Sequence, residues 1–250
     1  VAASEGSSLT AKQTEDLAEL STRVNQLCAL AAHHKVKILI DAEETWIQQA
    51  IDELVVANMR EFNHEQVIVY NTIQLYRTGR IAEIQRQIAA ARASDYKIGF
   101  KLVRGAYMEK ERLRAAEKGY VSPIQVSKEN TDSDYDEALR LCFENRDVVS
   151  VMAGTHNEAS SYLLAQLIAD AQLDKKDDRF WFAQLYGMSD HISFNLAHAG
   201  YNVAKYLPYG PVKEVLPYLS RRAQENSSVK GQAGRELSLI ITEIKRRKLA

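Results

Sequence analysis

The feature that most constrains this chain is a recurring unit in which a short β-rich run precedes an amphipathic helical stretch. Successive runs lie mostly about 30 residues apart, the size of one βα unit. They are rich in Val, Ile, Phe and Tyr and nearly continuous in hydrophobicity, which is typical of parallel strands covered on both faces. The runs comprise residues 36–41, 67–72, 98–103, 148–154, 180–187 and 203–210. This alternation predicts an α/β fold with a parallel sheet.

The stretches between the runs carry helix start signals and apolar stripes. Thr10 with Gln13, and Thr45 with Gln48, each fit a capping box. Apolar residues then recur at helical spacing, and each set predicts a stripe that packs on the sheet. The sets are Leu17, Leu20, Val24, Leu27 and Ala31; Ile47, Ala50, Ile51, Leu54 and Val55; and Ile81, Ile84 and Ile88.

The ends of the runs favour a closed barrel over an open doubly wound sheet. An open nucleotide-binding sheet would carry a Gly-rich turn after its first strand, and neither that turn nor a P-loop is present. Polar residues instead follow nearly every run, and a barrel gathers strand ends around one mouth, where its active site lies. These residues are Asp41, Asn71, Lys101, Thr155, His156, Gln184 and Tyr206. A complete barrel has eight strands, so we expect two more strands before Val1.

Composition narrows the class of protein. Of the 250 residues, 46% are apolar, which suffices for a sizeable core in one domain spanning 1–250. The formal charge of −1 gives no reason to expect a nucleic-acid partner, although it leaves room for a local basic patch. Cys28 and Cys142 match no metal spacing and favour a reducing compartment. No signal peptide or membrane-spanning run is visible, but the chain begins with Val1, so we expect the native N-terminus elsewhere.

Asp41 and Lys101 are the first candidates for chemistry. Asp41 ends one run, and the acids after it also suit a helix N-terminus. Lys101 lies within another run, where a buried amine needs a partner or a role, so a structural ion pair with Asp41 is the alternative. Gly105 would let a ligand approach the backbone closely.

The third candidate segment is the last helix, where Tyr218, Arg221, Arg222 and Glu225 form a polar stripe. Two adjacent guanidiniums suit a carboxylate or phosphate, and a solvated basic face is the alternative. Pro217 within this stretch indicates either a kink or a late helix start. His156, taken by itself, is more often structural than catalytic, and no metal-binding pattern accompanies it.

Six motifs together resemble the proline dehydrogenase family, and its single-function enzymes more than its fused bifunctional ones. They are ILIDAEE (38–44), VYNTIQLY (69–76), FKLVRGAY (100–107), GTHNEAS (154–160), QLYGM (184–188) and YLPYGPVKEVLPYLSRRAQEN (206–226). The resemblance implies a distorted (βα)₈ barrel of the TIM type that lacks its first two strands here. It also implies FAD at the barrel mouth and a last helix that caps this mouth.

The resemblance also implies roles for individual residues. Arg221 and Arg222 would hold the carboxylate of L-proline, and Tyr206, Tyr218 and Leu185 would surround its ring. Asp41 would orient the reacting groups, and Lys101 would donate a hydrogen bond to flavin N5. The residues expected to hold FAD are Ala42, Asn71, Val103, Arg104, Gly105, Ala106, Thr155, His156 and Gln184. No metal is expected.

The implied reaction transfers hydride from C5 of L-proline to flavin N5 and gives Δ1-pyrroline-5-carboxylate, the first step of proline catabolism. Electrons would pass to a membrane quinone, which implies a cytoplasmic protein peripheral to the inner face of the cytoplasmic membrane. In a eukaryote the implied location is the mitochondrial matrix side. Tyr206 would favour proline over hydroxyproline, because relatives that prefer hydroxyproline carry a smaller residue there.

Two departures from the family pattern leave alternatives open. The family's substrate lysine on an early strand has no counterpart, and residues 1–9 resemble the loop after that strand. A missing N-terminal segment or a complementary chain would therefore complete the barrel. Lys101 also replaces an arginine common in bacterial members, so the geometry of its flavin contact differs. The rival interpretations are a Schiff-base aldolase that uses Lys101 and an inactive barrel fragment.

Overall fold

Six parallel strands form one sheet in the order β1-β2-β3-β4-β5-β6. The computed structural model describes residues 8–228 and 232–247, and for residues 221–228 and 232–236 it describes the backbone alone. The strands are β1 (Ile38–Ile40), β2 (Val69–Gln74), β3 (Ile98–Val103), β4 (Val149–Gly154), β5 (Phe180–Leu185) and β6 (Val203–Tyr206). All six predicted strands are confirmed. The main differences are that β2 continues to Gln74 and that β6 ends at Tyr206, before Pro208.

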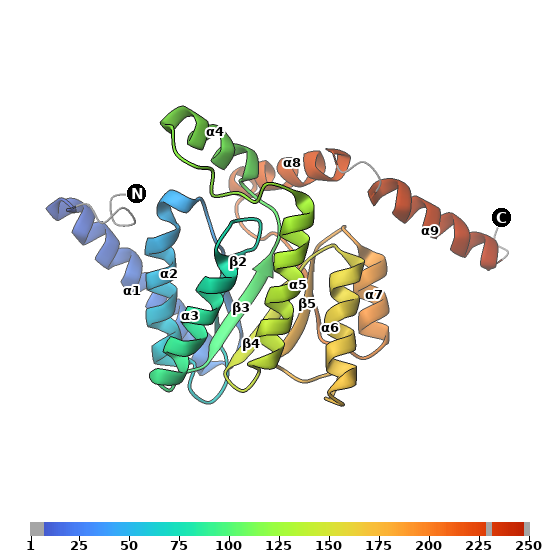
Figure 1. Ribbon diagram of the computed structural model, residues 1–250, viewed down its shortest axis with the longest axis horizontal. Coiled ribbons are helices and arrows are strands. Elements are labelled where there is room, and N and C mark those ends of the chain that lie inside the picture. The colour runs from blue at the N-terminus through green and yellow to red at the C-terminus, as the bar shows by residue number, and fades with distance from the viewer. Residues whose placement is uncertain (1–7, 229–231, 248–250) are drawn as a thin grey trace.

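Helices connect and follow the strands in the predicted alternation. They are α1 (Ala11–His33), α2 (Thr45–Phe62), α3 (Arg80–Ala93), α4 (Met108–Lys118), α5 (Lys128–Glu144), α6 (Glu158–Asp170), α7 (Asp190–His198), α8 (Val212–Ser228) and α9 (Gln232–Arg246). Figure 1 shows α2, α3, α5 and α6 side by side over one face of the sheet. It also shows α4 and α8 on the side of the molecule toward which the arrowhead of β3 points.

The register assigns side chains to the two faces of the sheet. Thr72 of β2 pairs with Lys101 of β3, and Lys101 pairs with Met152 of β4. Paired residues of parallel strands point to the same face and their neighbours in sequence to the other. The face opposite Lys101 carries the main core, which packs under the helices. This core includes Val69, Ile73, Ile98, Phe100, Leu102, Val149, Val151, Phe180 and Phe182, all buried.

One of the two predicted capping boxes is confirmed. The side chain of Thr10 accepts a hydrogen bond from the backbone N–H of Gln13, and the side chain of Gln13 accepts one from the backbone N–H of Thr10. The box at Thr45 and Gln48 is wrong, because Glu44 is the N-cap and Thr45 is already the first helical residue. Gln48 instead accepts a hydrogen bond from the backbone N–H of Glu43 at 2.7 Å.

The predicted apolar stripes pack to different degrees. Ile84 and Ile88 of α3 are buried, as expected. On α1, Val24 and Ala31 pack against the core, but the prediction is wrong for Leu20 and Leu27, which are more than half exposed. The reason lies at the edge of the sheet. Within the described residues β1 pairs only with β2, so no further strand or helix covers that side of α1.

None of the described helices combines the length and the apolar character that a membrane crossing requires.

Candidate active site

An ion pair between Lys101 and Asp41 lies at the carboxyl end of the sheet. Nζ of Lys101 donates a hydrogen bond to Oδ1 of Asp41, which follows β1. The Lys101 side chain is only 20% exposed, whereas that of Asp41 is 61% exposed. The hydroxyl of Thr72, on the strand between them, donates to the carbonyl of Ile40 at 2.8 Å. The half-buried lysine therefore has the partner that its position requires, and the carboxylate remains open to a ligand.

Gln74 joins this site and was missed by the sequence analysis. It is the last residue of β2, two residues after the register partner of Lys101, so it lies on the same face. Its side chain is buried and donates to the carbonyl of Glu43 at 2.7 Å and to the hydroxyl of Tyr76 at 2.8 Å. The motif VYNTIQLY could have revealed Gln74, because a strand that continues two residues beyond Thr72 ends at Gln74 on the same face.

Asn71 and Gln184 lie on the opposite, helix-facing side of the sheet. Asn71 is fully buried and donates to Oδ1 of Asp52 on α2 at 2.8 Å. Gln184 accepts from the hydroxyl of Ser193 on α7 at 2.8 Å and donates to the carbonyl of Thr155. The structure therefore does not bring either side chain to Lys101. The physical reason is that successive side chains of a strand point to opposite faces, whereas the prediction considered only which polar residues lie near the strand ends.

Arg104, the residue after β3, is held between α5 and α6. Its guanidinium lies 3.8 Å from the ring centroid of Tyr135, is ion-paired with Asp132 and donates to the hydroxyl of Ser160. Burial alone would raise the pKa of Asp132, but hydrogen bonds from Lys128 and Arg104 lower it below its ordinary value. The planar guanidinium thus fixes the chain where β3 ends, before residues 105–107.

The turn after Arg104 leaves room for a ligand. A Cβ built on Gly105 would meet no atom within 4 Å, and Gly105 is exposed. Val103 precedes this turn with its side chain on the Lys101 face, and Ala106 follows within it. The backbone at Gly105 is therefore accessible from solvent at the same end of the sheet as Lys101.

Thr155 and His156 form the turn between β4 and α6. The hydroxyl oxygen of Thr155 accepts from the backbone N–H of Asn157 at 3.1 Å, and Asn157 caps α6 by accepting from the N–H of Ser160. The Nδ1 atom of His156 lies 3.1 Å from the hydroxyl of Ser189. These contacts give both residues a structural role at a helix start, and they place His156 at the carboxyl end of β4.

The start of α4 is clamped to the start of α2 by Glu111, a second residue that the sequence analysis missed. Its carboxylate is buried and accepts from the backbone N–H and the hydroxyl of Thr45, at 2.6 and 2.8 Å. Lys110 pairs with Glu44, and Arg114 lies 4.3 Å from the ring centroid of Trp46. These contacts tie the segment after FKLVRGAY to the segment after Asp41. No local sequence pattern predicts the contact between Glu111 and Thr45, which are 66 residues apart.

Tyr206, Leu185 and Tyr218 come together at the end of β6. Leu185 and Tyr206 are register partners, so they share a face. The rings of Tyr206 and Tyr218 meet edge to face with centroids 5.6 Å apart, which brings α8 to the strand end. The helix begins at Val212 and continues through Pro217, which excludes a late start. Arg221 and Arg222 lie on α8, but their side chains fall outside the described residues.

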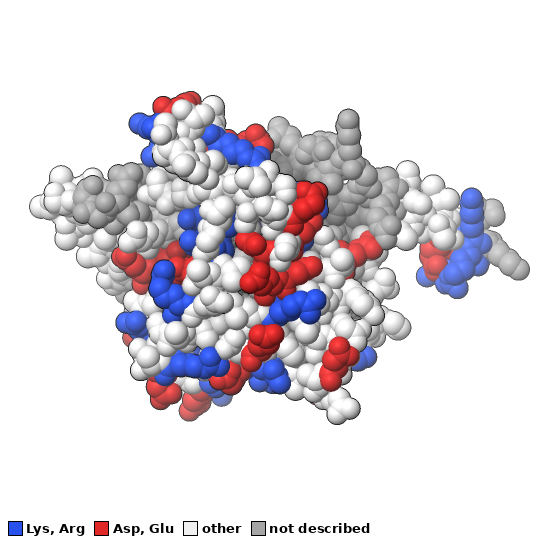
Figure 2. Space-filling view, viewed as in Figure 1, with Lys and Arg blue, Asp and Glu red and all other residues white. Residues whose placement is uncertain are grey.

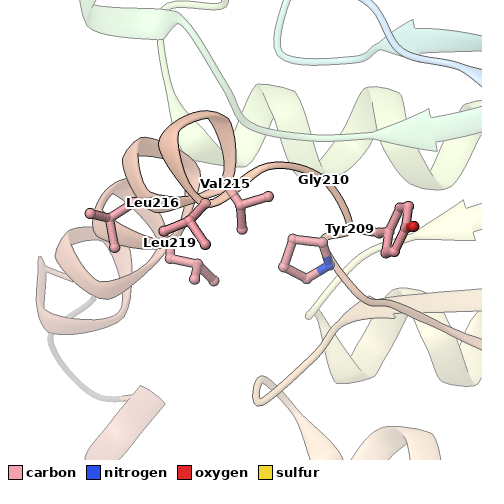
Figure 3. A pocket seen from close by; sticks show the side chains of 7 residues that line it. Tyr209, Gly210, Val215, Leu216 and Leu219 are labelled. Atoms are coloured by element: carbon pink, nitrogen blue, oxygen red, sulfur yellow. The ribbon is translucent and has the colours of Figure 1, made fainter.

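An open hollow of about 220 Å³ lies beside α8. Figure 3 shows Val215, Leu216 and Leu219 along α8, with the Tyr209–Gly210 turn beside them. The apolar stripe of this helix therefore lines a solvent-facing hollow in place of packing into the core. Among the described residues, no group of three His, Cys, Asp or Glu side chains is placed to hold a metal ion.

Comparison with protein families gives one match over most of the chain. Residues 2–235 match the model of the family described as proline dehydrogenase. Human mitochondrial proline dehydrogenase 1 is 39% identical over 244 residues, which cover 96% of this chain and 41% of that protein. The corresponding Drosophila melanogaster protein is 37% identical over 246 residues, covering 94% of this chain and 36% of its own length. This chain thus spans about two-fifths of these relatives.

Solved structures give the same fold. Proline utilization A from Bdellovibrio bacteriovorus superposes with a TM-score of 0.79 at 22% identity, over 87% of this chain and 22% of that one. The Bradyrhizobium japonicum protein (mutant D778Y) gives a TM-score of 0.76 at 27% identity, over the same shares of the two chains. These matches confirm the expected distorted (βα)₈ barrel, of which the described residues form six curled strands.

Proposed function

Because this chain belongs to the proline dehydrogenase family, we propose that the protein containing it oxidises L-proline to Δ1-pyrroline-5-carboxylate, the first step of proline catabolism. The observation that carries this proposal is the Lys101–Asp41 pair at the carboxyl end of the curled sheet, the end where barrel enzymes hold their substrates. Asp41 and Lys101 are the proposed catalytic residues.

The residues at this end of the sheet fit FAD, which supplies the hydride acceptor when it is bound. The exposed backbone at Gly105 offers a close approach, and the amine of Lys101 offers a cation to an electron-rich ring. Ala42, Val103, Ala106 and His156 would complete the cradle, since all follow or end strands at this edge. Gln74, with its amide on the Lys101 face, is the better candidate for a ring contact than Asn71 or Gln184.

The proposed substrate site lies between β5, β6 and α8. Arg221 and Arg222 would bind the carboxylate of L-proline, a task that suits the paired donors of guanidinium groups. Leu185, Tyr206 and Tyr218 would enclose the pyrrolidine ring. The ring contact between Tyr206 and Tyr218 supports this arrangement, because it joins the helix that carries the arginines to the end of β6.

Tyr206 is proposed to set the choice between proline and hydroxyproline. A relative named hydroxyproline dehydrogenase, from Xenopus laevis, is 39% identical over 235 residues and covers 91% of this chain. The Tyr206 ring packs edge to face against Tyr218, and in the proposed substrate site its bulk would exclude a hydroxyl group on the substrate ring.

A further segment is proposed to complete the barrel, either as an N-terminal part or as a complementary chain. The support comes from the two edges of the sheet. Within the described residues β1 and β6 each pair on one side only, and Leu27, Leu30 and Val36 expose apolar surface beside β1. The human and Drosophila melanogaster relatives are mitochondrial proteins. For this protein we propose a peripheral position on a membrane whose quinone accepts the electrons.

The test is a visible spectrum of the protein that contains this chain, recorded before and after L-proline is added, with the intact mass of the same sample. We expect flavin absorbance that L-proline bleaches. A colourless protein whose Lys101 is trapped with a carbonyl substrate by borohydride would support the aldolase alternative instead. A protein without flavin and without either reaction would support an inactive scaffold.

A further inference from the structure

Helix α9 presents an apolar stripe that nothing in the described structure covers. Leu237, Ile240 and Ile241 are 57%, 56% and 43% exposed, and Ile244 continues the stripe one turn later. These positions follow the i, i+3, i+4, i+7 pattern of one helix face. Figure 1 shows α9 extending away from the sheet, joined to the remainder through α8. The stripe thus faces neither the core nor the candidate active site.

Basic residues accompany this stripe. Between residues 237 and 247 the chain carries Lys245, Arg246 and Arg247 against a single acid, Glu243. At 3.6 residues per turn, Lys245 and Arg247 fall on opposite sides of the stripe. Glu243 binds Arg246 and Arg247, at 2.6 and 2.7 Å, on the side of the helix away from Lys245. Figure 2 shows the Lys and Arg side chains gathered at the far end of α9.

We propose that α9 lies in the surface of a bilayer that contains anionic phospholipid. Its aliphatic stripe would enter the boundary between headgroups and acyl chains, and Lys245 and Arg247 on its two flanks would meet the phosphates. An aliphatic stripe with cations on both flanks is the pattern of helices that lie in a membrane interface. The excess of basic residues complements an anionic leaflet.

This inference rests on the proposed function only for the reason why the protein would bind a membrane, namely that a quinone in the bilayer would receive the electrons. Membrane binding itself requires no turnover. It is therefore measured without proline or an electron acceptor, and a failure of binding is distinguishable from a failure of catalysis.

The experiment is co-sedimentation of the protein with vesicles of phosphatidylglycerol and phosphatidylcholine, and with vesicles of phosphatidylcholine alone. We expect binding to the anionic vesicles that weakens as salt is added. Ile240→Asp combined with Ile244→Asp should lower the affinity by about tenfold or more, because charge would enter the apolar boundary. Leu239→Asp is the matched control, since Leu239 is exposed on the other side of the same helix and its variant should bind normally.

Several outcomes would overturn the proposal. They are unchanged binding of the double variant, an equal loss in Leu239→Asp, and no binding by the unmodified protein. A dimer in sedimentation velocity that the double variant dissociates, without any vesicle binding, would assign the stripe to a second copy of this chain. If the double variant loses helical circular dichroism, Lys245→Gln with Arg247→Gln replaces it. That variant keeps the stripe and should lose only the preference for anionic vesicles.

Discussion

Lys101 on β3 donates a hydrogen bond to Asp41 after β1, so the pair reaches across β2 at the carboxyl end of the sheet. The two strands are brought within reach by the curl of the sheet and by Thr72, which ties β2 to the carbonyl of Ile40. The contact fixes the Lys101 side chain on the face of the sheet opposite the helices, while most of the Asp41 side chain stays exposed. A cation and a carboxylate are thereby held ready at one place, before any ligand is bound.

Replacing Lys101 tests whether this cation acts in the proposed reaction. Lys101→Met should slow the reduction of bound flavin by L-proline about 10²- to 10³-fold, the usual loss when one stabilising donor is removed. Lys101→Arg keeps the charge and should retain most of the rate. Stopped-flow bleaching of flavin absorbance measures both, with the exposed Lys176→Met as the surface control. A Lys101→Met protein that reduces at the unmodified rate would remove Lys101 from the mechanism.

Two glycine substitutions separate a ligand contact from a packing contact. Gly105→Ala should leave the denaturant midpoint of the free protein unchanged, because its Cβ would meet nothing within 4 Å. If FAD approaches this backbone, the same variant should bind flavin more weakly in a fluorescence titration. Gly99→Ala should lower the free energy of unfolding by about 2 kcal/mol or more, since its Cβ would lie 2.6 Å from Cγ of Tyr70. Normal flavin affinity in Gly105→Ala would exclude a close approach there.

The strands were predictable because helices bury one face of this sheet and its curl partly covers the other, which leaves nearly continuous runs of Val, Ile and Phe in the sequence. The same runs end in the residues that meet at one edge, so the proximity of Asp41 and Lys101 was foreseeable as well. That part of the candidate site follows from topology alone.

Other parts depend on details that composition does not encode. The register decides which face of the sheet a side chain occupies, and it turns Asn71 toward the helices. Because β2 continues to Gln74, the amide on the Lys101 face is that of Gln74. The clamp between Glu111 and Thr45 joins residues 66 positions apart, with no periodic signal in either segment. Leu20 and Leu27 follow a helical stripe faithfully and are still exposed, because burial requires a neighbour as well as a pattern.

Removing the Glu111 clamp should destabilise the protein. Glu111→Ala would leave the backbone N–H and hydroxyl of Thr45 without their acceptor in a half-buried setting, at a cost of about 2 kcal/mol. Glu117→Ala, an exposed position on the same helix, is the matched control for the loss of an acid. Urea denaturation followed by circular dichroism measures the difference. Equal midpoints for the two variants would show that the clamp adds nothing to stability.

The half-buried carboxylate of Asp52 should make stability depend on pH in a defined direction. Burial raises its pKa above the ordinary value, although hydrogen bonds from Asn71 and Gln48 and the charge of Arg80 oppose the shift. A raised pKa in the folded state means that protonation stabilises the fold, and this stabilisation is lost as pH rises through that pKa. Asp52→Asn cannot ionise, but its amide oxygen can still accept from Asn71. The stability of the variant relative to the unmodified protein should therefore improve from about pH 4, near the unfolded pKa of aspartate, toward neutral pH. Urea midpoints measured across this range decide the matter, since a constant difference would show that Asp52 titrates alike in the folded and unfolded chains.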